Sequence, residues 1–229
     1  KPGHNAVFTN PARVLRVGMI VLVASMTVSC PSLLVPIGRT VDHGDLERRY
    51  LLYVPNSYDA ESPAPLVIVL HGGQSPPELA ALYTNFHELG NTEGFITAYP
   101  EGYGHNWNDG SLEASDDAHE RNIDDVGFIE KIMDDIAGRY SVDQSRVYIA
   151  GISSGAAMAH RFAAERSERV AAISAGMGGV PAYALKEWQP LEPVSVMCFN
   201  GTDDPIMPYD GGEARLSVTR ELYGVVGSV

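Results

Sequence analysis

The chain has 229 residues, a formal net charge of −13 and an isoelectric point of about 4.8. This length suffices for one domain with a hydrophobic core, and the apolar and charged fractions are those of a soluble globular protein. A chain this acidic repels nucleic-acid phosphates, so we exclude DNA and RNA as partners; no cysteine and histidine cluster has zinc spacing, so we expect no metal site.

Residues 1–35 have the layout of a secretory leader. Arg13 and Arg16 precede a short apolar run, residues 17–29, that ends in small residues. The run is too short for a comfortable membrane span, so we expect export to the periplasm or the medium and no stable membrane span. A buried strand or a retained anchor is the alternative. Cys30 is a candidate lipid-attachment site, although Thr27 is not the large apolar residue usual three positions earlier.

Residues 36–229 predict a single domain in which strands and helices alternate. Residues 38–45 and 47–55 predict a hairpin, and the apolar run 66–70 predicts a strand buried on both faces. Residues 77–90 predict one helix that ends at Gly90. The side chains expected on its inward side are Leu79, Leu82, Tyr83, Phe86 and Leu89.

A strand at 95–100 leads into a long loop, residues 101–121, of the length that is usually functional or mobile. Asp124 or Asp125 is expected to cap a helix that reaches residue 140. The inward residues of that helix are predicted to be Phe128, Ile129, Ile132, Met133 and Ile136.

Further strands are predicted at 146–150, 170–175 and 194–199, with a last helix at 213–223. Cys198 lies in the apolar strand 194–199 and is expected to be a buried thiol. The connector 177–193 is too short for a separate lid domain. Alternating apolar strands and helices predict a doubly wound, mostly parallel α/β sheet, whose sites gather at the carboxyl ends of the strands.

One motif marks a candidate nucleophile at such a strand end. Gly151, Ser153 and Gly155 form a Gly-x-Ser-x-Gly pattern between the strand 146–150 and a helical run of small residues. This is the nucleophile-elbow pattern, in which a tight strand-to-helix turn exposes the serine hydroxyl and leaves no room for side chains two residues away. A glycine- and serine-rich surface loop is the alternative interpretation.

Acyl transfer by Ser153 requires a base and hydrogen-bond donors for an oxyanion. One donor is expected to be the backbone N–H of Ser154, and the other that of Gly73 or Gln74, in the loop after the strand 66–70. The alternative interpretation is that this loop, which begins with His71, is a plain turn.

An acidic partner for the base is expected after the strand 194–199. Asp204 and Asp203 are both candidates for the carboxylate that orients an imidazole. The alternative is an Asp-Pro turn, because Pro205 follows Asp204 directly.

These motifs together resemble one family. Residues 65–73, 122–128, 146–158 and 201–209 look like the polyhydroxybutyrate depolymerase and feruloyl esterase-like group of secreted α/β-hydrolase serine esterases. The resemblance covers about residues 39–212.

The resemblance implies an α/β-hydrolase fold and no cofactor. It favours Asp204 over Asp203 as the triad acid, with Ser153 as nucleophile and Gly73 with Ser154 as the oxyanion region. His71 and Trp107 are expected to bind substrate, and Trp107 is equally readable as a buried loop anchor.

One departure from the family pattern concerns the base. The family's histidine follows the aspartate, and residues 205–229 contain no histidine. We therefore expect the last strand and helix of the fold to be missing, the domain to be incomplete at its C-terminus, and this chain to be catalytically weak. His105 and His119, in the long loop, are the only plausible substitute bases.

The sequence thus predicts an exported carboxylic-ester hydrolase that acts on feruloyl or acetyl esters of plant polysaccharide or on small-molecule esters. A polyhydroxyalkanoate depolymerase is the runner-up. A serine peptidase of the same fold, and a binding protein that kept the elbow but lost the base, are the rival classes.

Overall fold

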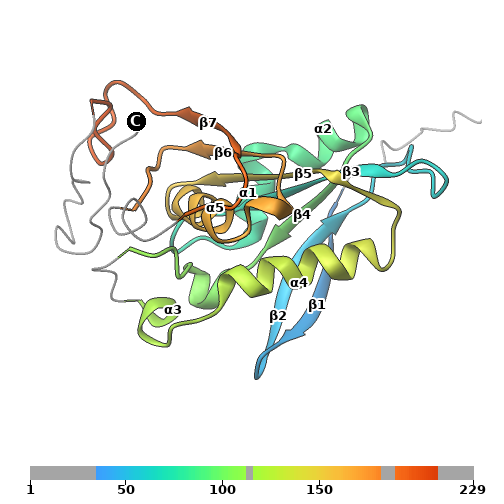
Figure 1. The fold of residues 1–229 in the computed structure, drawn as a ribbon, viewed down its shortest axis with the longest axis horizontal. Coiled ribbons are helices and arrows are strands. Elements are labelled where there is room, and N and C mark those ends of the chain that lie inside the picture. The colour runs from blue at the N-terminus through green and yellow to red at the C-terminus, as the bar shows by residue number, and fades with distance from the viewer. Residues whose placement is uncertain (1–34, 112–115, 182–188, 211–229) are drawn as a thin grey trace, which may run out of the picture. The chain divides into compact units, whose positions relative to one another are not determined.

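The described residues build one mixed β-sheet with helices on both faces (Figure 1). The structure is a computed structural model that describes residues 35–111, 116–181 and 189–210. Its strands are β1 (Ile37–His43), β2 (Leu46–Tyr53), β3 (Ala64–Leu70), β4 (Ile96–Pro100), β5 (Val142–Ile152), β6 (Ala172–Gly176) and β7 (Ser195–Phe199). Its helices are α1 (Pro77–Thr84), α2 (Phe86–Glu93), η1 (Tyr103–His105), α3 (Asp117–Glu120), α4 (Asp125–Ala137), α5 (Ser154–Glu165) and η2 (Ser167–Arg169).

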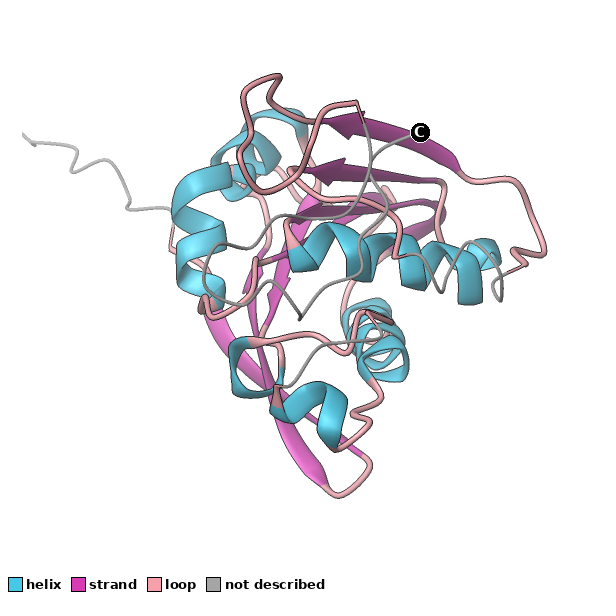
Figure 2. Ribbon diagram, turned by 90° about the vertical axis from the view of Figure 1, so that its left-hand side faces the viewer, coloured by secondary structure: helices cyan, strands magenta, loops and turns pink. Residues whose placement is uncertain are grey.

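The strands follow the order β1-β2-β4-β3-β5-β6-β7 across the sheet. β1 and β2 form an antiparallel hairpin that turns at Gly44, where φ is +58°, and β2 pairs antiparallel with β4. All pairs from β4 to β7 are parallel. The predicted hairpin and the predicted doubly wound, mostly parallel sheet are therefore confirmed. The hairpin extends away from the parallel part of the sheet in two views (Figure 1, Figure 2).

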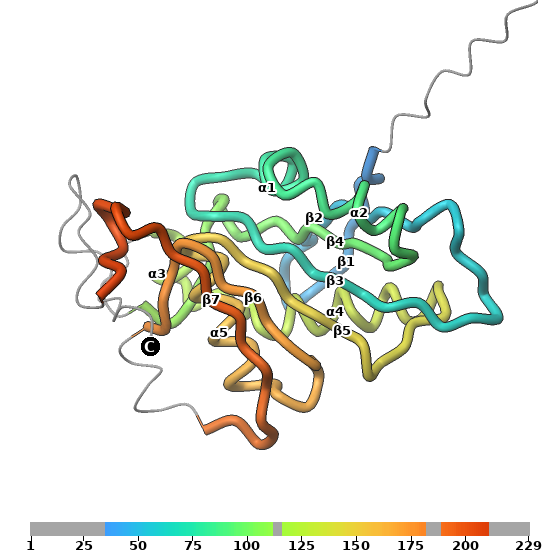
Figure 3. Tube along the Cα trace, turned by 90° about the horizontal axis from the view of Figure 1, so that it is seen from above, coloured from blue at the N-terminus to red at the C-terminus, as the bar shows by residue number. Residues whose placement is uncertain are grey.

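The core lies on both faces of β3, as its continuous apolar sequence predicts. Leu66, Ile68 and Leu70 pack in the larger cluster, with the buried faces of α4 and α5, whereas Val67 and Val69 face the cluster that contains α1. Figure 3 shows α1 and α2 on one side of the sheet and α4 and α5 on the other. Burial on both faces removes the side chains from Leu66 to Leu70 from water, which stabilises the strand that leads into the His71 loop.

Helix α4 matches the prediction closely. The carboxylate of Asp124 accepts a hydrogen bond of 2.9 Å from the Gly127 N–H and caps the helix. The five residues predicted to face inward are all buried, namely Phe128, Ile129, Ile132, Met133 and Ile136. This apolar face fixes α4 against the sheet, so the residues at its first turn are held firmly.

The single helix predicted at 77–90 is wrong. Asn85 adopts a left-handed conformation with φ of +52°, which separates α1 from α2. The helical segment does not end at Gly90 either. Helix α2 continues to Glu93 and is capped by Gly94, whose φ is +79°. Of the five side chains predicted to face inward, Phe86 packs against the core and Leu79 is partly buried, whereas Leu82, Tyr83 and Leu89 are exposed. The exposed fractions of Leu82 and Tyr83 are 69% and 70%, because Ala80 and Ala81 occupy the buried face.

The prediction that Cys198 is buried is also wrong. Its thiol is exposed, as are the neighbouring side chains of β7. β7 has β6 on one side and is the last strand of the sheet within the described residues, so its faces and outer edge are open there. An apolar sequence therefore does not show how many neighbours a strand has.

Four loops leave the sheet at one edge. In the parallel register Leu70 lies beside Gly151, Ile152 beside Gly176, and Gly176 beside Phe199. The chain segments that begin at His71, Ser153, Met177 and Asn200 consequently start next to one another. This is the carboxyl edge at which ligands bind in open α/β sheets.

Several sequence predictions concern residues outside the described ranges. The predicted leader, including Cys30, lies outside these ranges except for Val35, and so does the helix predicted at 213–223. The connector 177–193 is described only in part. No helix among the described residues is long and apolar enough to cross a membrane.

Candidate active site

Ser153 occupies a strained turn between β5 and α5. Its φ is +55° and its ψ is −121°, a conformation that costs a non-glycine residue roughly 1–3 kcal/mol. The Ser153 N–H donates to the carbonyl of Gly176 at 2.9 Å, which ties the turn to β6. The Ser153 side chain is exposed. A strained, exposed serine at the carboxyl end of a strand is the arrangement expected of a nucleophile elbow.

The two glycines of the motif are required by close backbone contacts. A Cβ on Gly151 would lie 2.1 Å from the carbonyl oxygen of Gly155. A Cβ on Gly155 would lie 2.5 Å from the carbonyl oxygen of His71, on the neighbouring loop. Both distances are far below van der Waals contact with backbone atoms that cannot move aside. The elbow therefore packs directly against the loop that follows β3.

The two predicted oxyanion residues adjoin each other. A Cβ built on Gly73 would lie 3.4 Å from the Oγ atom of Ser154, and one on Gly72 would lie 3.5 Å from the Cβ atom of Ser153. Of the two alternatives for the second donor, the N–H of Gln74 already donates to the carbonyl of His105 at 2.8 Å. The geometry thus favours Gly73, together with Ser154 in the first turn of α5, where the helix dipole favours negative charge.

His71 is a buried, neutral histidine that shapes this loop. Its Nε2 atom accepts a 2.9 Å hydrogen bond from the Gly102 N–H, and its Nδ1 atom lies 2.7 Å from its neighbour's carbonyl, that of Gly72. Burial lowers the pKa of His71 to about 4, although the Gly72 carbonyl opposes that shift. The side chain is 1% exposed and both ring nitrogens are engaged, so this geometry supports a role in holding the loop rather than in contacting substrate.

Trp107 is likewise 1% exposed. Its Nε1–H donates to the carbonyl oxygen of His71 at 2.8 Å, and its ring lies 4.7 Å from the His71 ring between centroids. Of the two sequence interpretations of Trp107, the geometry favours the loop anchor over the substrate contact.

Asp204 is oriented by the backbone that follows it. Its Oδ1 atom accepts hydrogen bonds from the N–H groups of Ile206 and Met207 at 2.8 and 3.0 Å. No described residue binds its Oδ2 atom, which leaves that oxygen for an imidazole. Asp203 is exposed and none of the described residues orients its carboxylate. The geometry therefore favours Asp204 of the two candidates, in the segment that leaves β7 at the edge where Ser153 lies.

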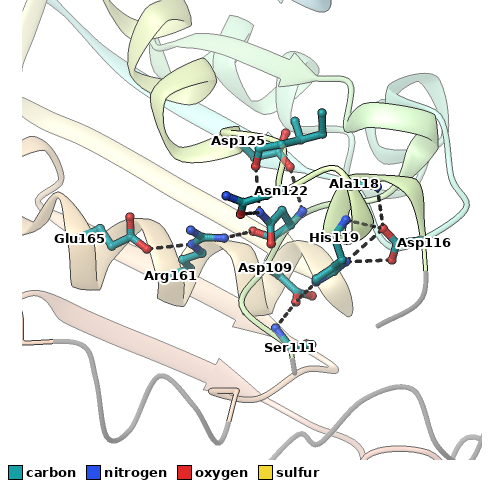
Figure 4. A network of polar contacts seen from close by, with 11 residues as sticks. Asp109, Ser111, Asp116, Ala118, His119, Asn122, Asp125, Arg161 and Glu165 are labelled. Carbon is teal, nitrogen blue, oxygen red and sulfur yellow. Dashed lines mark hydrogen bonds and ion pairs between the residues drawn. The ribbon is translucent and has the colours of Figure 1, made fainter. Parts of the chain in front are cut away.

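The two candidate substitute bases have other partners. The imidazole of His119 lies between two carboxylates, with Nε2 3.2 Å from Asp109 and Nδ1 3.0 Å from Asp116 (Figure 4). Burial lowers the pKa of His119, but its hydrogen bonds to these two carboxylates outweigh burial and raise the pKa above its ordinary value. His105 is half exposed and lies 3.4 Å from Glu101. No contact in the described residues joins either imidazole to Ser153.

The sequence interpretation missed the polar anchors of the long loop. Arg48 and Asp125 form a buried ion pair with 2.7 Å between Nη2 and Oδ1. The other Asp125 oxygen accepts from the Asn108 N–H at 2.8 Å. The available signal was Arg48 itself, a charged residue in a strand where inward positions are otherwise apolar. The described residues hold no cluster of three or more side chains suited to a metal ion.

A sequence model of a known protein family, described as "Esterase PHB depolymerase", matches residues 48–212. The chain belongs to this family. The matched residues include the elbow, the Gly73 loop and Asp204, so the site just described is part of the family domain. The family's description names an esterase, and the curated relatives of the chain are carboxylic-ester hydrolases.

Curated relatives are esterases. The chain is 32% identical over 147 residues to "Putative esterase NocK" of Nocardia uniformis subsp. tsuyamanensis, which covers 64% of this chain and 42% of the relative. It is 29% identical over 172 residues to "Probable feruloyl esterase C" of Aspergillus niger, and this match covers 72% of the chain and 58% of the relative. The chain thus spans about half the length of the curated relatives that it matches.

Solved structures confirm the fold. A thermostable esterase superposes with a TM-score of 0.58 at 20% identity, covering 76% of this chain and 48% of its own. An acetyl xylan esterase from Aspergillus awamori superposes with a TM-score of 0.51 at 22% identity, covering 65% of this chain and 53% of its own. The predicted α/β-hydrolase fold is therefore correct.

Proposed function

We propose that the chain is the catalytic domain of an exported serine carboxylic-ester hydrolase that forms an acyl-enzyme. The observation that carries this proposal is the joint position of Ser153, Ser154 and Gly73, with the strained, exposed serine close to the two residues whose N–H groups are the candidate donors. In this mechanism Ser153 Oγ attacks the ester carbonyl and the alcohol leaves. Water then hydrolyses the acyl-serine to release the acid and restore the hydroxyl.

Each described residue has a role in these steps. The N–H groups of Ser154 and Gly73 stabilise the oxyanion of both tetrahedral intermediates. Removal of the Ser153 proton requires an imidazole base, which Asp204 is placed to orient through the Oδ2 atom that no described residue binds. The family pattern places this histidine after the aspartate, and residues 205–229 contain none. His71 and Trp107 keep the Gly73 loop in place. The mechanism assigns no step to a metal or cofactor.

For the substrate we propose feruloyl or acetyl esters of plant polysaccharide, or small-molecule esters of those acids. Support comes from the relatives, which include feruloyl esterases and a bifunctional acetylxylan esterase and xylanase from Neocallimastix patriciarum. A polyhydroxyalkanoate is the second candidate, because the matching family is described as a depolymerase of that kind. The leader-like residues 1–35 support export.

The test compares the hydrolysis of four esters and one peptide amide by the purified protein in its natural full-length form. We expect faster release of acid from methyl ferulate and p-nitrophenyl acetate than from poly(3-hydroxybutyrate) or a long-chain triglyceride. Faster hydrolysis of the polyester would move the assignment to the second candidate. Preference for the triglyceride, or for a peptide amide, would contradict both.

The nucleophile is tested in the same assay. Ser153→Ala should reduce turnover by several orders of magnitude, while Ser145→Ala, an exposed serine at the far end of β5, should leave it unchanged. The rival class of binding proteins would be supported if the wild-type protein bound feruloylated oligosaccharide without hydrolysing it and did not react with a fluorophosphonate probe.

A further inference from the structure

The Trp107–Asn108 segment contacts both elements that carry oxyanion donors. On one side, the Trp107 Nε1–H donates to the His71 carbonyl oxygen at 2.8 Å. That oxygen lies two residues before Gly73, and the same oxygen would be 2.5 Å from a Cβ on Gly155 of α5. The His71 carbonyl is therefore the point where the Gly73 loop, helix α5 and the Trp107 indole meet.

On the other side, the segment is bound to α5 through Asn108. The carbonyl oxygen of Asn108 accepts a hydrogen bond from Nη1 of Arg161, whose Nε donates to Glu165 at 2.8 Å (Figure 4). Arg161 lies about two helical turns after Ser154. Because a hydrogen-bonded helix moves as a unit, a tether at Arg161 also restrains the N-terminus of α5.

A buried ion pair fixes the segment itself. The Asn108 N–H donates to Oδ2 of Asp125 at 2.8 Å, and Oδ1 of Asp125 accepts from Arg48 at 2.7 Å. Both charged side chains are almost completely buried. Asn108 also donates through Nδ2 to the carbonyl of Ile123 at 2.9 Å. Residues of α4 and α5 thus restrain the segment directly, and Arg48 of β2 holds Asp125 in place.

We propose that Trp107 and Asn108 form a positioning bridge that holds the Gly73 and Ser154 N–H donors at the spacing an oxyanion requires. The inference deepens the proposed esterase function and rests on it. The two donors belong to different elements, so their separation is not set by either element alone. Donors must lie about 2.7–3.1 Å from the oxyanion, and a misplacement of about 1 Å can lower the rate on the order of 100-fold. Trp107 acts through His71 and touches no reacting atom.

The test uses Trp107→Phe in the natural full-length protein. Phenylalanine keeps a ring against His71 but removes the donor to its carbonyl. We expect kcat for p-nitrophenyl acetate to fall about 10- to 100-fold with KM changed less than about threefold. Affinity for a boronic acid, which mimics the tetrahedral intermediate, should fall in parallel with kcat. Arg161→Met, which removes the donor, should cause a smaller loss of the same kind, and Arg161→Lys, which keeps a donor, should restore part of it.

A matched control separates positioning from general stability. Tyr50→Phe removes a 2.7 Å hydrogen bond to Asp135 from another fully buried aromatic side chain and should leave kcat and boronate affinity unchanged. Equal kcat values for Trp107→Phe and wild type would overturn the proposal, as would equal kcat losses in Trp107→Phe and Tyr50→Phe.

Amide hydrogen exchange tests the bridge without turnover. Trp107→Phe should accelerate exchange at Gln74 and Gly102, whose N–H groups bond to His105 and His71, while Ile68 in β3 stays protected. Unchanged exchange at Gln74 and Gly102 would overturn the bridge. If wild type neither hydrolyses esters nor binds the boronate, the proposed function fails, and the exchange data still decide whether the bridge exists.

Discussion

Leu70 of β3 and Gly151 of β5 are partners in the parallel register of the sheet. The loop that carries Gly73 and the turn that carries Ser153 therefore leave neighbouring strands at the same edge. The contact is so close that Gly155, two residues after the serine, has no space for a Cβ beside the His71 carbonyl. A single steric relationship thus links the fold to the chemistry of the site.

Replacing Gly155 by alanine should disrupt this contact. The new methyl group would lie 2.5 and 2.6 Å from the carbonyl oxygens of His71 and Leu70, so the loop or the helix must shift. We expect a loss of about 1–3 kcal/mol in the free energy of unfolding and a large loss of turnover, measured by denaturant titration and ester hydrolysis. Gly38→Ala is the control, because nothing lies within 4 Å of its Cβ position. Equal stability of both variants would show that the elbow is not packed as described.

Stability should fall in acid because of buried neutral histidines. Burial lowers the pKa of His160 to about 4, against about 6.5 in an unfolded chain. Between those values the unfolded state binds a proton that the folded state does not, so the free energy of unfolding decreases as pH falls from about 6.5 toward 4. The contribution is on the order of 3 kcal/mol. His160→Met should flatten the dependence measured by urea unfolding at several pH values, whereas a slope identical to wild type would argue against the buried state of this imidazole.

His119 gives the opposite pH dependence of stability from His160. Its folded pKa is raised by Asp109 and Asp116, so its stabilising contribution is complete below the unfolded pKa and is lost as pH rises through the folded value. Amide exchange of Ile123, whose N–H donates to the carbonyl of Ala118 in α3, should accelerate as pH is raised through that range, beyond the intrinsic rise of the exchange rate with pH. His119→Gln should remove this extra pH dependence. An unchanged dependence in the variant would contradict the ion-pair assignment.

The elements that follow from local sequence were predictable. The β3 run, the α4 stripe and the elbow each combine an apolar period with a clear start or stop signal, and all three have the expected structure. The break at Asn85 was not predictable, because an asparagine in a left-handed conformation carries little local signal and the periodic leucines suggested one helix. Tertiary packing selected Ala80 and Ala81 for the buried face instead.

The candidate site divides in the same way. Ser153, Ser154 and Gly73 are marked by glycines whose spacing has a steric cause, so the sequence identifies them. The roles of His71 and Trp107 depend on a hydrogen bond between residues 36 positions apart, which no pattern reveals. The ion pair of Arg48 and Asp125 joins residues 77 positions apart and is equally invisible in the sequence.

Reaction with a fluorophosphonate probe tests the central claim, that Ser153 is an activated nucleophile, most directly. The natural full-length protein would be treated with the probe, digested and analysed by mass spectrometry, beside Ser153→Ala and Ser145→Ala. We predict one labelled serine, Ser153, with labelling lost in Ser153→Ala, retained in Ser145→Ala and paralleled by methyl ferulate hydrolysis. Rapid labelling at another residue, or ester hydrolysis that survives in Ser153→Ala, would contradict the assignment.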